Sequence, residues 1–65
     1  MENHARSEIE KIIDEWIHSE MDRKILRRKL LDGITHERLA EELDVSVSCI
    51  KQRVKRGKTI LYKHL

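Results

Sequence analysis

The sequence of 65 residues contains no proline and no phenylalanine, and only two glycines, Gly33 and Gly57. Residues that break helices are therefore almost missing, which favours an all-helical fold. The chain has a single cysteine, Cys49, so no disulfide can form within it. A chain of this size buries only about 60% of the surface that its unfolded state exposes, so regular helices or a partner subunit must supply its stability.

Several functional classes lack the residues that they need. The chain has four scattered histidines, His4, His18, His36 and His64. None of them is paired with Cys49 at a spacing typical of a metal site. His36 and Glu37 resemble the start of a zinc-protease helix, but Ala40 stands where the second histidine is required. The sequence shows no catalytic set, phosphate-binding loop or cofactor motif, so we expect no enzyme, no metal and no cofactor.

Long apolar runs and a secretion signal are also missing. Apolar residues occur in runs that are too short to cross a bilayer. The first ten residues are polar and of mixed charge, unlike a signal peptide. Together with one reduced cysteine, these features predict a cytoplasmic protein with no membrane partner.

The net charge is only +2, but the charges are unevenly distributed. Segment 46–65 contains basic residues and no acidic one, whereas acidic residues gather at 8–15 and 37–44. A one-sided basic surface is typical of a protein that binds a polyanion, although a solvated helix face gives the same pattern. A second basic run lies at Arg23, Lys24, Arg27, Arg28 and Lys29. For this run we expect a solvated face, with phosphate contact as the alternative.

Apolar residues recur at helical spacing in four segments. They predict an all-α fold, a four-helix helix-turn-helix bundle in which an N-terminal helix joins a three-helix core, within one domain over residues 1–65. The expected helices cover residues 7–17, 20–32, 36–44 and 47 onward to near the C-terminus. The apolar face shifts near His18 and Ser19, so we expect a break there, with one long bent helix as the alternative.

Polar residues and glycines mark the expected ends of these helices. Hydroxyls that can accept from first-turn amides stand at Ser7, Ser19, Thr35 and Ser46. Gly33 follows the second helix, as expected for a left-handed C-terminal residue. The expected inward face of the second helix consists of Met21, Ile25, Leu26, Leu30 and Leu31. Gly57 falls on the inward face of the last helix, which indicates either close approach by another helix or a local bend.

The last two helices are joined by about three residues, which is the arrangement of a helix-turn-helix. Ala40 is small enough to stand where the two helices cross. Asp44 tolerates the left-handed conformation that the turn requires, and Val45 is expected to fill the elbow. The motif covers about residues 35–56, and its recognition helix begins at Ser46.

Ile50 and Val54 anchor this helix inward and leave a polar face outward. That face carries Ser48, Cys49, Lys51, Gln52, Arg53, Lys55 and Arg56. Lysine and arginine donate to guanine or phosphate, and glutamine pairs with adenine through two hydrogen bonds. Ser46 and the first-turn amides can bind a phosphate, and Thr35 and His36 can do so one helix earlier. All these residues form the expected DNA-binding site.

The order of motifs from Leu30 to Val54 has a counterpart in a known family. A helix ending at Gly33 is followed by one unit with Ile34, Thr35, Leu39 and Ala40, and by another with Val45, Ser46, Ile50, Lys51 and Arg53. In this order they resemble the promoter-recognising region 4 of bacterial sigma factors. Asp44 departs from the pattern, which commonly has glycine at the turn. The resemblance covers about two-thirds of the chain, and small stand-alone proteins of phages and integrative elements in Gram-positive bacteria are similar.

The resemblance implies that the protein reads a short promoter-like element in the major groove of double-stranded DNA, with RNA polymerase as a further partner. Complete sigma factors also have a domain that binds the polymerase core and melts the promoter, and the chain has no counterpart of it. We therefore expect a transcription regulator and not a complete sigma factor.

Two alternatives stay open at this point. The chain can instead be a protein-interaction module that docks on RNA polymerase or another regulator without reading DNA. The first helix, rich in isoleucine and carrying Trp16, is expected to pack over the motif. The alternative is a symmetric homodimer, formed through this helix or through the C-terminal one. For Trp16 we expect a place in the core or in an interface.

Overall fold

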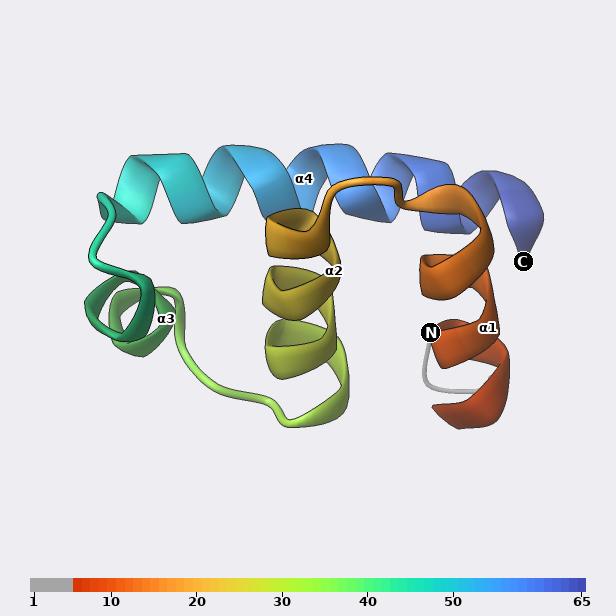
Figure 1. Cartoon of the computed structure of the whole chain (residues 1–65), viewed down its shortest axis with the longest axis horizontal. Helices are drawn as coiled ribbons and strands as arrows, with labels where there is room; N and C mark the ends of the chain where they lie inside the picture. Colours follow the sequence, from red (N-terminus) through yellow and green to blue (C-terminus); the bar gives the residue numbers. More distant parts are fainter. Residues whose placement is uncertain (1–5) are drawn as a thin grey trace.

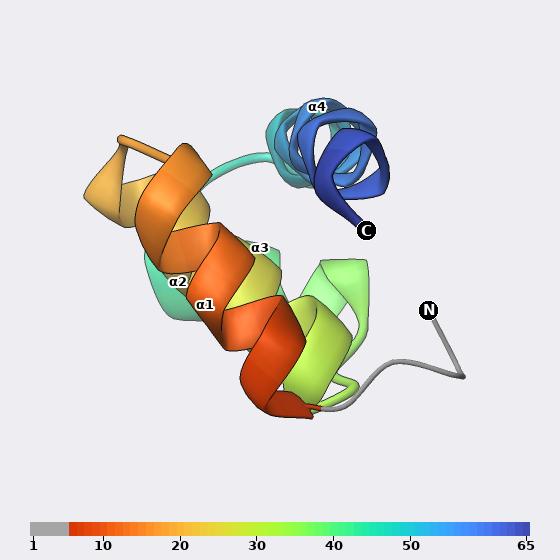
Figure 2. The ribbon, with the colours of Figure 1, turned by 90° about the vertical axis from the view of Figure 1, so that its right-hand side faces the viewer.

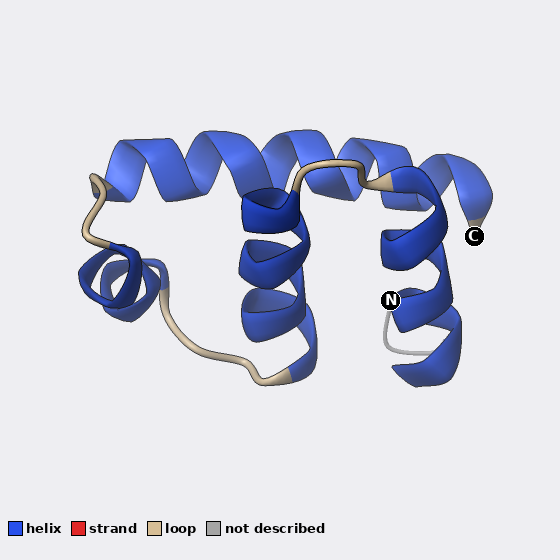
Figure 3. Cartoon of the chain, viewed as in Figure 1, coloured by secondary structure: helices blue, strands red, loops and turns tan. Residues whose placement is uncertain are grey.

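The computed structural model describes residues 6–65 as helices joined by short loops (Figure 3). In chain order these are α1 (Arg6–Trp16), α2 (Glu20–Leu26) with the π-helical turn η1 (Arg27–Leu31), α3 (His36–Leu43) and α4 (Val47–His64). The predicted all-α helix-turn-helix bundle is confirmed. The bounds expected from the sequence agree with these to within one residue at most helix ends.

The long helix α4 contacts each of the other three helices. Along it, from the C-terminal to the N-terminal end, lie α1, α2 and α3 (Figure 1). Helices α1 and α2 run antiparallel to each other and cross α4 steeply, and Figure 2 shows α4 lying to one side of this pair. Helix α4 therefore connects α1, at one end of the molecule, with α3 at the other.

The buried side chains form two clusters along α4. The first consists of Ile9, Ile12, Ile13, Ile17, Leu26 and Leu61. The second consists of Ile25, Leu39, Ala40, Ile50 and Val54, with Val45 and Val47 packed against it. Each fully buried side chain of this kind stabilises the fold by about 1.5–3 kcal/mol. The apolar stripe of α1 is therefore buried within the chain, and the second cluster fixes α3 against α4.

The chain breaks between α1 and α2 and does not continue as one bent helix. Ser19 has extended backbone, and its Oγ accepts the N–H of Asp22 at 3.3 Å, so Ser19 is the N-cap of α2. The prediction that Ser7 caps α1 is wrong, because α1 begins at Arg6. The Arg6 guanidinium pairs with the Asp32 carboxylate at 3.3 Å, which ties the start of α1 to the end of the second helix.

The second helix ends in a wider turn than the predicted α-helix. The N–H of Asp32 donates to the carbonyl of Arg27, five residues earlier, at 3.3 Å. Gly33 follows with φ +72°, the left-handed conformation expected there. The prediction that Met21 is buried is wrong, because it lies in the first turn of α2, before the packed part of the helix begins at Ile25, and is 39% exposed.

Gly57 marks a close contact between α2 and α4. A Cβ atom at this position would lie 2.6 Å from Cδ2 and 2.9 Å from Cγ of Leu26. Helix α4 continues through Gly57 from Val47 to His64. Close approach by another helix therefore accounts for the glycine.

Trp16, the last residue of α1, lies outside both clusters. Its side chain is 45% exposed and stacks on His64, with ring centroids 3.9 Å apart and planes 7° from parallel. The prediction of a place in the core is therefore wrong for Trp16. At this end of α1 it is the next residue, Ile17, that is buried in the first cluster. The contact joins the C-terminal ends of α1 and α4.

Candidate nucleic-acid interface

The turn between α3 and α4 sets the direction of the recognition helix. Asp44 has φ 55° and ψ 48°, the left-handed conformation expected of it. The N–H of Val45 donates to the carbonyl of Ala40 at 3.0 Å, which closes the end of α3. At the start of α4 the Ser46 Oγ accepts the N–H of Cys49 at 3.1 Å. Ser46 is therefore the N-cap of the helix, as predicted.

Most of the predicted contact residues on α4 face the solvent. The side chains of Ser48, Lys51, Gln52, Lys55 and Arg56 are exposed. The side chains of Ile50 and Val54 are buried in the second cluster. The predicted division of α4 into an inward apolar face and an outward donor face is confirmed at these positions, so the helix presents hydrogen-bond donors and positive charge to a ligand.

Arg53 is less free than the sequence suggested. Its Nη1 donates to the Oδ1 of Asp22, in the first turn of α2, at 2.6 Å. The two side chains are only 33% and 19% exposed. The hydrogen bond to Asp22 raises the pKa of Arg53, and a smaller contribution comes from Cys49. The prediction that Arg53 and Cys49 lie exposed is wrong, because both side chains are half-buried, Arg53 beside Asp22 of α2.

Thr35 and His36 stand at the beginning of α3. The Thr35 Oγ1 accepts the N–H of Arg38 at 3.1 Å, so the hydroxyl serves as the N-cap of α3. His36 is half-buried, and burial lowers the pKa of its imidazole, with Lys29 as the next cause and Lys51 a smaller one. Glu37 raises the pKa of His36, so the charges around the imidazole are mixed, with Lys29 having the largest effect among them.

Two lysines near His36 were not among the contact residues predicted from the sequence. Lys29 of η1 and Lys58 of α4 both lower the pKa of His36 through their charge. The Nζ of Lys29 also donates to the carbonyl of Ile34 at 3.2 Å, in the loop before α3. Their spacing along the chain gives no hint of this grouping, since it arises only when η1, α3 and α4 pack together.

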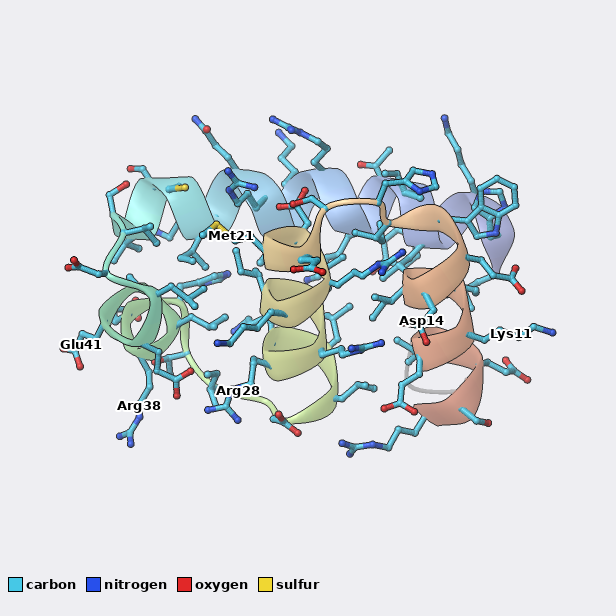
Figure 4. The ribbon with its side chains drawn as sticks, viewed as in Figure 1. Lys11, Asp14, Met21, Arg28, Arg38 and Glu41 are labelled. Carbon is cyan, nitrogen blue, oxygen red and sulfur yellow. The ribbon has the colours of Figure 1, made fainter. Side chains whose placement is uncertain are left out.

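The basic run 23–29 holds the helices together and is not simply a solvated face. Arg23 donates to the main-chain carbonyls of Ile17 and Asp14 near the end of α1. Arg27 pairs with the Asp14 carboxylate. The Arg28 guanidinium reaches from η1 toward α3 (Figure 4) and bonds both carboxylate oxygens of Glu42. These donors are engaged inside the fold, which argues against the alternative of phosphate contact.

Other kinds of site find no support within residues 6–65. No three histidine, cysteine, aspartate or glutamate side chains gather there as a metal site would require. His4, one of the four histidines considered, lies outside the described residues. None of the helices that the structure describes is long and apolar enough to span a bilayer.

Comparison with known proteins identifies a family. The family model described as Sigma-70, region 4, matches residues 19–63. This match covers the whole helix-turn-helix, α2 and nearly all of α4, and it leaves out α1. Searches of the curated proteins and of the solved structures gave no match. The chain therefore belongs to the sigma-70 region 4 family of helix-turn-helix DNA-binding modules.

Proposed function

We propose that the protein is a sequence-specific, double-stranded DNA-binding regulator of transcription that inserts the N-terminal half of α4 into the major groove. The observation that carries this proposal is the outward face of α4. It presents exposed lysine, glutamine and arginine side chains on a helix that the Asp44 turn and the second cluster hold in place. No acidic residue follows Ser46 in the sequence. An α-helix fits the major groove, where base edges are distinguishable.

The exposed positions divide by the contacts that they suit. Lys51 and Gln52 stand side by side in the second turn of α4, where side chains can reach base edges. Lys55 and Arg56 follow one turn later and suit phosphates of the same groove. The N-terminal ends of α3 and α4, at Thr35 and Ser46, bring first-turn amides and positive helix-dipole ends to the backbone.

A salt titration tests the proposal. Affinity for a short duplex of random sequence is expected to fall steeply as salt rises, because each phosphate contact releases counterions. Lys51→Ala should weaken discrimination between sequences or reduce the salt slope by about one unit, depending on whether Lys51 contacts a base or a phosphate. Lys24→Ala removes the same charge from an exposed site on α2 and serves as the matched control. An affinity that does not change with salt, or no binding at low salt, would contradict the proposal.

Docking on RNA polymerase or another regulator without reading DNA is the second candidate. The observation on its side is the bond from Arg53 to Asp22, which takes one N–H donor of a potential base reader. Binding of the chain to purified RNA polymerase in the absence of DNA, together with no affinity for any duplex, would support this candidate over the first.

A cytoplasmic location and a homodimer accompany the first proposal as predictions. Burial of the α1 stripe against Leu26 and Leu61 removes the apolar surplus that motivated a dimer through that helix. Sedimentation equilibrium at micromolar concentration, with and without duplex, measures the oligomeric state directly.

A further inference from the structure

The Arg53 side chain is held by a residue that lies outside the helix-turn-helix. Asp22 belongs to the first turn of α2, and its Oδ1 lies 2.6 Å from the Arg53 Nη1. Because both side chains are mostly withdrawn from water, the pair is less screened than an ordinary surface ion pair. The contact joins a helix that lies outside the helix-turn-helix, and packs against it, to the helix proposed to read DNA.

Asp22 is itself fixed in place. Its main-chain N–H donates to the Oγ of Ser19, the N-cap of α2. The first turn of a helix also favours a negative charge, because the helix dipole is positive there. The next turn is anchored by Ile25, which is fully buried in the second cluster together with Ile50 of α4. The carboxylate is therefore a rigid partner for Arg53.

We propose that Asp22 is a positioning residue for DNA recognition, which orients the Arg53 guanidinium beside Gln52 so that its other N–H groups meet a base edge. This inference rests on the proposed function. A guanidinium has five N–H donors in a planar fork, and the bond to Asp22 uses one of them. A third of the Arg53 side chain remains exposed. Orienting it before DNA arrives lowers the entropy lost on contact, which strengthens discrimination.

A purely structural ion pair predicts a different behaviour. If Asp22 only joined α2 to α4, removing its charge would lower stability and leave the preference between DNA sequences unchanged. If Asp22 orients Arg53, removing the charge lowers that preference. It also leaves affinity for random DNA unchanged or higher, since a negative charge near the phosphates has gone. The ratio of the two affinities separates these roles.

The experiment measures affinities of the full chain for two probes. One is a short duplex of random sequence, and the other is a duplex that the wild-type protein selects from a random pool. Asp22→Asn is expected to reduce the affinity ratio of selected to random duplex by about tenfold, as for loss of an oriented arginine contact. Asp14→Asn is the matched control, because Asp14 also pairs with an arginine, Arg27 of η1, but lies on α1.

Two further variants complete the test. In an Arg53→Ala background, Asp22→Asn should cause no additional loss of the ratio, since no guanidinium is left to orient. Asp22→Glu keeps the carboxylate and should restore part of the ratio; it also serves if Asp22→Asn does not fold, which circular dichroism shows. An unchanged ratio in Asp22→Asn, or a further loss in the Arg53→Ala background, overturns the inference alone. A wild-type protein that selects no duplex overturns the proposed function and the inference with it.

Discussion

The Leu26 side chain of α2 lies against the backbone of Gly57 in α4, with no space between them for a Cβ atom. Gly57→Ala should therefore lower the free energy of unfolding by up to about 2 kcal/mol: overpacking costs about 1–3 kcal/mol, and the better helix propensity of alanine offsets about 1 kcal/mol. Leu26 is fully buried in the first cluster and has little room to move away. Urea unfolding followed by circular dichroism measures the difference.

The effect of Gly57→Ala should change sign once the space is opened. Leu26→Ala alone should cost about 2–5 kcal/mol, because it leaves a cavity. In that background Gly57→Ala should raise the free energy of unfolding by up to about 1 kcal/mol, the propensity difference between alanine and glycine. A destabilising Gly57→Ala in both backgrounds would show that Leu26 is not the obstacle.

Asp44→Gly should stabilise the protein. Asp44 has φ 55°, a conformation that costs most L-residues roughly 1–2 kcal/mol, aspartate less than that and glycine almost nothing. We expect a gain of about 0.5–1 kcal/mol in the free energy of unfolding, because glycine also gives the unfolded chain more freedom. Asp44→Val, at the same position, should lose more than 1 kcal/mol. Thermal unfolding of the wild type, Asp44→Gly and Asp44→Val compares their melting temperatures. A valine variant as stable as the wild type would contradict the argument from backbone strain.

The Glu42 carboxylate should make the free energy of unfolding depend on pH in the acid range. Its hydrogen bonds with Arg28 hold the pKa of Glu42 below its ordinary value of 4.5. Because the folded pKa is lower than the unfolded one, the stability from this group is present above the unfolded pKa and is lost as pH falls through the folded pKa. The melting temperature of Glu42→Gln should therefore be lower than that of the wild type at neutral pH and equal to it in strong acid. A pH-independent difference would assign the effect to packing.

DNA affinity should rise as pH falls if His36 faces a phosphate. In the free protein, burial lowers the pKa of His36, and the charge of Lys29 lowers it further. Because the folded pKa lies below the unfolded value of 6.5, the protein loses stability as pH falls below 6.5. A nearby phosphate favours the protonated form, so binding takes up a proton and strengthens as pH falls toward and below 6.5. His36→Gln should flatten this dependence in fluorescence anisotropy titrations. His18→Gln, at an exposed position, should leave it intact.

Local signals were enough to place the helices and the motif. Hydroxyl caps at Ser19, Thr35 and Ser46, the left-handed Gly33 and the apolar spacing of Ile50 and Val54 act within one or two turns, and each is found where it was predicted. These features depend on backbone geometry and on which side of a helix is apolar. Both properties are determined by residues close to one another in the sequence.

Contacts between distant segments were not predictable in the same way. The pairs Arg53–Asp22 and Arg28–Glu42 join residues 31 and 14 positions apart, and any of several acids along the chain has a suitable charge. The choice among them depends on how α2 and η1 rotate about their axes when they pack. For this reason the basic run 23–29 was expected to be solvated, although most of its side chains are bonded within the fold.

The neighbouring residues Ile25 and Leu26 pack in different hydrophobic clusters. The rotation of α2 about its axis is therefore fixed by both clusters at once. Inserting or deleting one residue in α2 before Ile25 turns the part of the helix that carries Asp22 by about 100° relative to that pair. The connection between the carboxylate and Arg53 is then lost while both clusters can still form. Apart from Asp22 and Arg23, whose side chains are bonded to other helices, the positions between the Ser19 cap and Ile25 should therefore tolerate exchange of residue type far better than a change of length.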